Sequence, residues 1–404
     1  MKESRMHRNR MTDQTADSDD REILKGALSG IRIVDLSRVL AGPWCTQCFA
    51  DMGAEVLKVE PPGVGDETRT WSPPSMGGHA AYFTCVNRGK SSIVLDLKAA
   101  SDRDRLLQAI AVADVVVENF RAGSLDRLGL GVDVMMAANP RLIICSISGY
   151  GRSGPEASRA GYDFVIQAES GLMAVTGDPD SQPMKVGVAV SDLFAGLYAS
   201  QAILAALIAR DRTGKGTHLD VSMFDCQVAA MANVAANALA TDMPSQRHGN
   251  GHPNVVPYRV FEAKDQPFVV AVGNDSQFGR LARDVIGQPQ LPDDPRFATN
   301  EARSCNRELL NASLADLFRQ RTAETWLTAL RKVNIPGGRI NDVTDALATK
   351  QAEERQLVQS FSTEGGQVCA VRYPVRAEGL CTEVTPPPKL GEGGEALLRN
   401  WLAG

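Results

Sequence analysis

Basic residues do not dominate this chain. Lys and Arg number 43 against 48 Asp and Glu, which gives a formal net charge of -5 at pH 7. General nucleic-acid binding needs a basic surface, so we expect no nucleic-acid partner. The eight cysteines are irregularly spaced, which is typical of reduced thiols in a cytoplasmic protein and not of a disulfide scaffold. The polar first 25 residues contain no apolar segment of a secretory signal. We therefore predict a disordered leader over residues 1–27.

The Gly-rich fingerprint of dinucleotide-binding proteins is missing as well. The first predicted strand leads into the turn Ser37–Pro43, which lacks the G-x-G-x-x-G spacing that brings a pyrophosphate close to the backbone. This speaks against a nicotinamide-dependent dehydrogenase. The segment Gly214–Thr217 (GKGT) resembles a phosphate-binding loop, but it follows a predicted helix and begins a strand, the reverse of the required order. A Gly-rich helix end explains it.

The histidines do not suggest a metal centre. His248 and His252 are four residues apart, yet Gly249 and Gly251 lie in the same short segment. Two ligands at this spacing hold a metal when they share one helix face, and the glycines disfavour a helix there. We predict a solvated loop and no metal ion.

Short apolar segments alternate with helical patterns through the first half of the chain. This alternation predicts an α/β fold with a doubly wound parallel sheet. A polar, Gly-rich loop then introduces a smaller α+β domain. The expected parts are a large domain (28–223), a small domain with a linker helix (224–340) and a segment that returns to the large domain (341–404). The predicted strands of the large domain are Ile31–Leu36, Glu55–Glu60, Ser91–Leu97, Asp114–Glu118, Leu142–Ile147 and His218–Met223, and its first helices are Pro43–Met52, Asp102–Val112 and Val132–Ala138.

The longest apolar stretch begins near Val190. Apolar or small residues surround it between Leu193 and Ile208, which predicts a helix buried on all sides. The stretch is too short and too mixed for a membrane span, so we expect no membrane partner. Asp192 stands at its beginning, where a helix N-terminus would keep a carboxylate ionised. This position is typical of an N-cap, and it also fits a nucleophilic carboxylate at a buried site.

A second candidate for chemistry is the pair Cys45 and Cys48. A Cys-x-x-Cys pattern at the start of a helix lowers the pKa of the first thiol and can support thiol–disulfide exchange. Nothing else in the chain resembles a small thioredoxin-like unit. A thiol–disulfide function therefore remains an alternative of a different class.

Short motifs follow one another along the chain from about Leu28 to the C-terminus. They are Asp35–Pro43, Asp51–Glu60, Asn87–Ile93, Leu95–Lys98, Val117–Gly123, Asn139–Ile143, Gly149–Gly151, Gly161–Asp163, Ser191–Leu193 and Thr213–Gly216. No single motif is decisive, but the order of the whole set is specific, and it resembles the class III CoA-transferase family. Within that family, Thr68–Trp71, Arg159–Asp163 and Val256–Tyr258 make the pattern most similar to succinate–hydroxymethylglutarate CoA-transferases.

The resemblance implies an interlocked homodimer, with an active site where the large domain of one subunit meets the small domain of its partner. It implies CoA transfer from an acyl-CoA, for which we expect succinyl-CoA, to a carboxylic acid, for which we expect a dicarboxylate. Coenzyme A would be a substrate, and no tightly bound cofactor is expected. The chemistry would pass through an aspartyl anhydride and an aspartyl-CoA thioester.

The same resemblance assigns roles to particular residues. Asp192 is the expected nucleophile. Arg38 or Arg69 is expected to bind the distal carboxylate of a dicarboxylic acid. The other expected lining residues are Leu40, Ala41, Tyr162, Asp163 and Gln167, and the expected CoA contacts are Val39, Leu95, Lys98, Asn119, Phe120, Arg127 and Leu128.

The main alternative is a 2-methylacyl-CoA racemase-type isomerase of the same fold. Those enzymes pair an aspartate at the position of Asp192 with a histidine that directly precedes the position of Asp163. In this chain, Tyr162 occupies the position of that histidine, and a tyrosine, with an ordinary pKa of about 10, is a poor base. The loop Arg247–Pro253 is a candidate lid, although it lacks the glycine tetrad of formyl-CoA relatives.

Overall fold

The structure is a computed structural model that describes residues 26–241, 243–380 and 383–404. The predicted leader therefore lies outside the described residues, apart from Gly26 and Ala27. The chain divides into two units. The first holds the described residues up to Ile166 together with Ala189–Gln227 and Leu357–Gly404, and the second holds Gln167–Val188 and Val228–Gln356. This division differs from the expected boundaries mainly in assigning residues 167–188 and 341–356 to the second unit.

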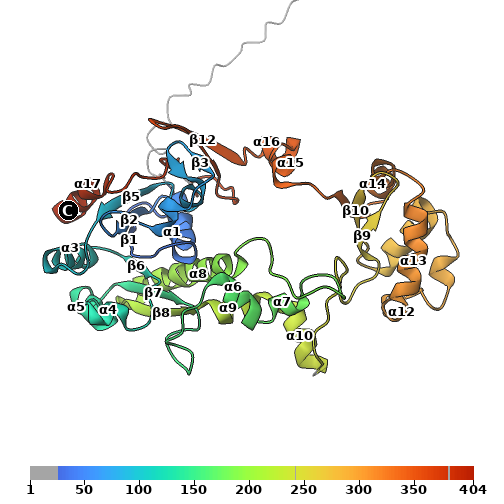
Figure 1. Cartoon of the computed structure of the whole chain (residues 1–404), viewed down its shortest axis with the longest axis horizontal. Helices are drawn as coiled ribbons and strands as arrows, with labels where there is room; N and C mark the ends of the chain where they lie inside the picture. The colour runs from blue at the N-terminus through green and yellow to red at the C-terminus, as the bar shows by residue number, and fades with distance from the viewer. Residues whose placement is uncertain (1–25, 242, 381–382) are drawn as a thin grey trace, which may run out of the picture. The chain divides into compact units, whose positions relative to one another are not determined.

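A six-stranded parallel sheet forms the centre of the first unit, as predicted (Figure 1). Its strand order is β5-β2-β1-β6-β7-β8. The order reverses between β1 and β6, and ligands of such sheets bind beyond the carboxyl ends of the strands at that point. The strands are β1 (Arg32–Asp35), β2 (Glu55–Glu60), β5 (Lys90–Val94), β6 (Val115–Glu118), β7 (Ile143–Ser148) and β8 (Thr217–Ser222).

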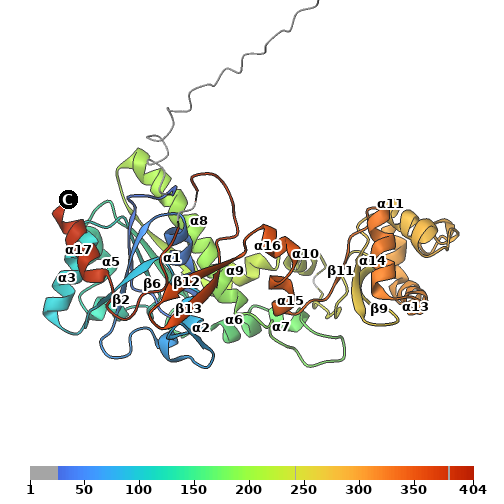
Figure 2. The ribbon, with the colours of Figure 1, turned by 90° about the horizontal axis from the view of Figure 1, so that it is seen from above.

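Helices cover both faces of this sheet. Helices α1 (Ala41–Asp51) and α8 (Val190–Thr213) pack on one face, and α3 (Ala100–Ala111), α5 (Val132–Ala138) and α17 (Gly394–Ala403) pack on the other. Alternate residues of β1 serve the two cores, since Ile33 packs towards α1 and α8 and Val34 packs towards α3 and α17. Figure 2 shows the C-terminal helix α17 beside α3. The expected return of the chain to the large domain thus ends in a core helix.

Helix α8 ends at Gly214, whose left-handed φ of 71° closes the helix as the Gly-rich segment predicted. Its inner face packs on α1 and the sheet through Ala195, Ala199 and Ile203. The prediction of burial on all sides is wrong for this chain by itself, because Leu197, Tyr198 and Ile208 are exposed. By length and composition, α8 is the one helix among the described residues that could cross a membrane, a description that core helices also fit.

The second unit is α+β, with a three-stranded antiparallel sheet in the order β11-β10-β9. Aromatic side chains fill its core, where the rings of Phe268 and Phe318 meet edge to face with centroids 5.3 Å apart. Its main elements are β9 (Tyr258–Glu262), β10 (Pro267–Ala271), β11 (Gly337–Arg339), α10 (Ala232–Thr241), α11 (Asp275–Arg280), α12 (Asn300–Cys305), α13 (Arg307–Phe318) and α14 (Ala323–Lys332).

Shorter elements complete the chain. In the first unit they are β3 (Ser75–Met76), β4 (His79–Ala80), α2 (Ala81–Thr84), α4 (Ser124–Arg127), β12 (Val358–Thr363) and β13 (Gly366–Val371). Helices α6 (Asp163–Glu169) and α9 (Met223–Ala230) each begin in the first unit and end in the second. Helices α7 (Leu172–Val175), α15 (Val343–Leu347) and α16 (Lys350–Glu354) belong to the second unit.

Candidate active site

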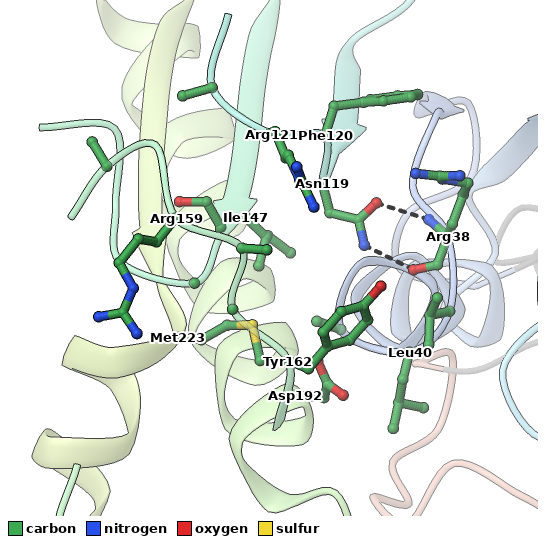
Figure 3. Close-up of a pocket in the computed structure, with 18 of the residues that line it drawn as sticks. Arg38, Leu40, Asn119, Phe120, Arg121, Ile147, Arg159, Tyr162, Asp192 and Met223 are labelled. Atoms are coloured by element: carbon green, nitrogen blue, oxygen red, sulfur yellow. Dashed lines mark hydrogen bonds between the residues drawn. The ribbon is translucent and has the colours of Figure 1, made fainter. Parts of the chain in front are cut away.

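A pocket opens where the strand order of the sheet reverses. Its walls come from the loops that follow β1, β6 and β7, and Asp192 of α8 closes one side (Figure 3). The backbone of Arg38 pairs with the Asn119 side chain, since the Arg38 N–H donates to Oδ1 over 2.9 Å and Asn119 Nδ2 donates to the Arg38 carbonyl over 2.7 Å. These two hydrogen bonds join the loops after β1 and β6, so the pocket lies at the position that the fold favours for ligands.

Asp192 lies in the first turn of α8 and is partly buried. It is not the N-cap, because that position is Ala189 and the Ser191 N–H donates to Asp163 Oδ1 over 2.8 Å. Burial, together with the smaller effect of the nearby charge of Asp163, raises the pKa of Asp192 to about 7. The expectation that the helix N-terminus holds this carboxylate fully ionised is therefore wrong at neutral pH, where part of it is protonated. Desolvation outweighs the helix dipole here.

Helix α1 begins at the same pocket with no side-chain cap. Within the described part of the chain, the N–H groups of Leu40, Ala41 and Gly42 have no hydrogen-bond acceptor. The preceding residue, Val39, is left-handed with a φ of 67°, which is unusual for a β-branched side chain. Leu40 and Ala41 line the pocket together with Asp192. The arrangement offers unsatisfied donors to an oxygen beside the carboxylate.

Two glycines line another part of the pocket. A Cβ on Gly149 would lie 2.5 Å from the Gly161 Cα, and a Cβ on Gly161 would lie 2.4 Å from the Gly149 Cα. The loop after β7 and the segment before α6 can approach this closely only because both residues are glycine. The contact places Tyr162 at the pocket, where its side chain remains 65% exposed.

Most of the expected CoA contacts lie in two neighbouring pockets that share Arg38 and Phe120. Val39 and Asn119 line the pocket of Asp192, and Leu95, Lys98 and Leu128 line a more apolar pocket beyond β1 and β5. Arg127 lines neither pocket, and its guanidinium donates to Ser124 Oγ over 3.1 Å.

The two expected carboxylate-binding arginines differ. The Arg38 side chain is exposed and lines both pockets. Arg69 instead forms a two-pronged ion pair with Glu60, from Nε to Oε2 over 2.7 Å and from Nη2 to Oε1 over 2.6 Å. Its guanidinium also lies 3.8 Å from the ring centroid of Phe83. The structure thus does not bring Arg69 into the pocket of Asp192.

Gln167 belongs to the second unit, where its amide is engaged by backbone groups. Its Nε2 donates to the Val188 carbonyl over 3.3 Å, and its Oε1 accepts from the Val186 N–H over 2.9 Å. These bonds give it a structural part in holding residues 186–188.

The pocket also contains cationic residues that the sequence reasoning did not single out. Arg121 and Arg159 line it, and the Arg159 guanidinium pairs with Glu156 over 2.7 Å. Both arginines stand within the recognised motifs Val117–Gly123 and Arg159–Asp163, so the signal was present in the sequence. Met223 and Glu67 also line the pocket and were not expected there.

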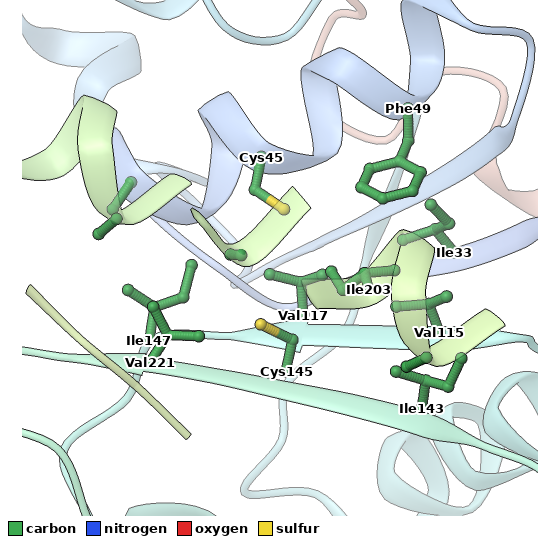
Figure 4. Packing of buried hydrophobic residues seen from close by; sticks show 14 of the residues in the cluster. Ile33, Cys45, Phe49, Val115, Val117, Ile143, Cys145, Ile147, Ile203 and Val221 are labelled. Carbon is green, nitrogen blue, oxygen red and sulfur yellow. The ribbon is translucent and has the colours of Figure 1, made fainter. Parts of the chain in front are cut away.

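The cysteine pair is sealed in the core. Cys45 and Cys48 are both buried free thiols of α1. Figure 4 shows Cys45 above the sheet, among aliphatic side chains such as Val117 and Ile203. Burial raises the pKa of Cys48 to about 11 and raises the pKa of Cys45 more strongly. A thiol–disulfide role needs an accessible thiolate, which this environment disfavours.

Comparisons with known proteins show the family of this chain. A family model described as CoA-transferase family III matches residues 28–393. Succinate–glutarate CoA-transferase of Agrobacterium fabrum is 43% identical over 376 residues, which cover 91% of this chain and 94% of that protein. Acetyl-CoA:oxalate CoA-transferase of Acetobacter aceti is 42% identical, with 94% and 97% covered. The crystal structure of a CAIB/BAIF family protein from Brucella suis matches with a TM-score of 0.82 and 44% identity, covering 93% of this chain and 99% of that one. The resemblance seen in the sequence is confirmed, and the chain is an enzyme that belongs to CoA-transferase family III.

Proposed function

We propose that this enzyme transfers CoA from succinyl-CoA to a dicarboxylic acid, with Asp192 as the nucleophile. The observation that carries the proposal is one pocket in which a partly buried carboxylate adjoins unsatisfied backbone N–H groups. The similar proteins named as succinate–glutarate and acetyl-CoA:oxalate CoA-transferases support a dicarboxylate as the acid. Glutarate is the first acceptor to test.

The proposed reaction conserves the energy of the thioester through two covalent intermediates. An oxygen of the Asp192 carboxylate attacks the thioester carbonyl, the C–S bond breaks, and an aspartyl–succinyl anhydride and CoA thiolate form. The thiolate then attacks the aspartyl carbonyl, which releases succinate and leaves an Asp192–CoA thioester. The acceptor carboxylate repeats these steps in reverse, so that acyl-CoA forms and the Asp192 carboxylate is regenerated. No proton is consumed.

Each attack produces a tetrahedral oxyanion beside Asp192. The N–H groups of Leu40 and Ala41 at the start of α1 are suited to receive it, because they face the same pocket and need no other bond broken first. The positive end of the α1 dipole adds to this stabilisation. In this proposal the backbone of α1 supplies the oxyanion hole.

The apolar pocket is the proposed site for the adenine part of CoA. Leu95, Phe120 and Leu128 offer apolar surface, and Lys98 offers a cation for a phosphate group. Arg38 lies between this pocket and that of Asp192 and has the exposed guanidinium that a carboxylate or phosphate needs. We assign it to the distal carboxylate of the acid.

We further propose that the enzyme works as an interlocked homodimer in the cytoplasm. The exposed apolar residues Leu197, Tyr198 and Ile208 of α8 support a partner subunit, since a helix of this composition is ordinarily covered. The lid role of Arg247–Pro253 stays a prediction. In the second unit, the guanidinium of Arg247 donates to the carbonyls of Asp178 and Ser181 over 3.1 and 2.9 Å.

A racemase-type reaction is the second candidate, and one observation favours it. A pKa of about 7 would suit Asp192 to proton transfer as well as to attack. The partner base of such enzymes is replaced by Tyr162, which weakens this reading. Incubation of a 2-methylacyl-CoA in deuterated water decides between them, because only the isomerase exchanges the α-hydrogen.

The proposal is tested by product analysis. The enzyme is incubated with succinyl-CoA and a panel of dicarboxylic and monocarboxylic acids, and new thioesters are detected by mass spectrometry. We expect glutaryl-CoA or a related dicarboxylyl-CoA. During turnover we also expect hydroxylamine to attack the activated carbonyl of Asp192, which forms a hydroxamate there and releases CoA from the thioester or succinate from the anhydride. A hydroxamate at another carboxylate, for example Glu169, would contradict the nucleophile, and absence of any transfer would contradict the function.

A further inference from the structure

Four buried charged residues lie directly beneath the loop that leads from β1 to α1. They are Asp35, Lys58, Asp66 and Lys90, and each has a relative exposure between 0% and 3%. Buried charges cost solvation energy, so fully buried acids and lysines are rare unless they are paired and hydrogen-bonded. None of the four lines the pocket of Asp192, and the proposed reaction does not use them directly.

The cluster is internally paired. Lys90 Nζ lies 3.0 Å from Asp35 Oδ2, and Lys58 Nζ lies 2.9 Å from Asp66 Oδ2. Burial by itself raises the pKa of Asp35, but the charges of Lys90 and Lys58 bring it down to about 2. Burial lowers the pKa of Lys90 to about 8. The pairs are therefore charged at neutral pH.

Several further bonds of the cluster go to the loop Ser37–Val39. Lys58 Nζ donates to the Ser37 carbonyl over 3.0 Å, and Asp35 Oδ1 accepts from the Ser37 N–H over 3.0 Å and also from its hydroxyl. Asp66 Oδ1 accepts from the Val39 N–H over 3.5 Å. Side chains thus form the hydrogen bonds with the backbone of this loop that neighbouring strands would form with a strand.

The first turn of α1 is held in the same way. Lys90 Nζ donates to the Pro43 carbonyl over 3.0 Å, and Thr46 Oγ1 donates to Asp35 Oδ2 over 2.7 Å. The cluster consequently forms hydrogen bonds with the chain on both sides of Leu40 and Ala41. Among the described residues, the N–H groups of these two residues have no acceptor. Val39, which has a left-handed backbone conformation, lies in the segment that the cluster holds by hydrogen bonds. Such a conformation persists only where surrounding contacts enforce it.

We propose that the Asp35–Lys90 and Lys58–Asp66 pairs are positioning residues that hold the Leu40 and Ala41 N–H groups in place for the oxyanion at Asp192. This inference rests on the proposed function. It also explains why four charges are kept in a region where apolar residues would cost less to bury. A displacement of about 1 Å in such a site can reduce the rate roughly 100-fold.

The test compares Asp35→Asn with a matched control, Asp51→Asn. Asp51 also forms a buried ion pair, with Arg88 Nε lying 2.9 Å from its Oδ1, but it stands at the other end of α1. Both substitutions remove one buried negative charge and should lower Tm. We expect Asp35→Asn to reduce kcat about 10- to 100-fold with KM for succinyl-CoA changed less than about twofold. Asp51→Asn should keep kcat within about twofold.

Amide hydrogen exchange supplies a readout that does not depend on activity. Peptides covering residues 36–44 should exchange faster in Asp35→Asn than in wild type or in Asp51→Asn. Equal losses of kcat in both variants, or unchanged exchange and kcat in Asp35→Asn, would overturn the positioning role. If Asp35→Asn does not fold, Ser37→Ala removes only the hydroxyl bond and should lower kcat about 3- to 10-fold. Unchanged kcat and exchange in a folded Ser37→Ala would then overturn the role.

The two proposals fail in different ways. A wild-type enzyme that transfers no CoA would overturn the proposed function and with it the catalytic consequence of the cluster, while the exchange experiment would still show whether the cluster holds the loop. A wild-type enzyme that transfers CoA and an Asp35→Asn variant that transfers it equally well would overturn the positioning role alone.

Discussion

Helices α8 and α1 of the first unit each carry potentially reactive side chains near their N-terminal ends, and these side chains lie in different environments. Asp192 in the first turn of α8 lines a pocket, whereas Cys45 and Cys48 of α1 are buried in the core. From the sequence, a helix start favours an ionised carboxylate at Asp192, and the Cys-x-x-Cys pattern favours a lowered pKa at Cys45. In the structure, burial raises the pKa of all three side chains. The difference is that Asp192 reaches a pKa of about 7, where a useful fraction is ionised, and remains accessible. Access and desolvation decide which helix start can react.

The start of α1 still contributes to the site, but through its backbone. Leu40 and Ala41 line the pocket, and among the described residues their N–H groups have no acceptor, whereas the two thiols are buried and line no part of it. The two helices approach closely because Gly196 of α8 packs on α1, where a Cβ would lie 2.6 Å from the Ala41 carbonyl oxygen. A carboxylate from one helix and donors from the other thus meet in one pocket.

We expect the largest effect from a substitution at Asp192 of α8, the reactive side of the comparison with α1. Asp192→Asn keeps the size of the side chain and removes the nucleophile, so kcat should fall at least about 10³-fold. The folded-state pKa of Asp192 is raised, so its ionisation destabilises the fold progressively as the pH rises from about 4 through about 7. We therefore expect the variant at pH 8 to unfold at the same Tm as wild type or at a higher one. Retained turnover, or a Tm well below wild type, would contradict this account.

The second effect separates the two loop arginines. Arg38→Lys should lower kcat/KM for glutarate about 10- to 100-fold more than for butyrate, because a charged hydrogen bond contributes roughly 1.5–3 kcal/mol and the ammonium cannot replace the planar fork. Arg69→Lys breaks the ion pair with Glu60 and should lower Tm without changing this selectivity. Steady-state kinetics with constant succinyl-CoA measure both variants. Equal losses for both acids in Arg38→Lys would assign Arg38 to CoA or to the fold.

The third effect concerns pH. Only the ionised form of Asp192 attacks, so kcat/KM for succinyl-CoA should rise about tenfold between pH 6 and pH 8 and then level off. Asp163→Asn removes the negative charge that raises this pKa and still offers an oxygen to the Ser191 N–H. Its profile should shift to lower pH by less than about one unit, because burial is the larger cause. A profile that stays in place would show that Asp163 does not influence the ionisation of Asp192.

Much of the first unit could be predicted from local patterns. Strand β2 (Glu55–Glu60) and helix α5 (Val132–Ala138) have the predicted bounds, because apolar periodicity and flanking glycines are local signals. The exposed face of α8 and the ion pair of Arg69 with Glu60 could not be predicted, since both depend on which segments meet in space. Motif order identified the family, and it is also the basis for the prediction that Asp192 is the nucleophile. The backbone N–H groups of Leu40 and Ala41 could not be predicted as part of the site, because a backbone donor is not specified by the type of side chain.

We expect the smallest effect from substitutions of the two buried thiols of α1. Cys45→Ser and Cys48→Ser should each leave kcat within about twofold under reducing conditions, because neither thiol lines the pocket and burial keeps both protonated. A buried hydroxyl without a full set of partners costs roughly 1–3 kcal/mol, so Tm should fall somewhat. Activity is compared with wild type at a temperature below both unfolding transitions, and circular dichroism serves as the control for folding. A folded variant with a large loss of turnover would show that the α1 thiols take part in the reaction, and the contrast between the two helix starts would no longer hold.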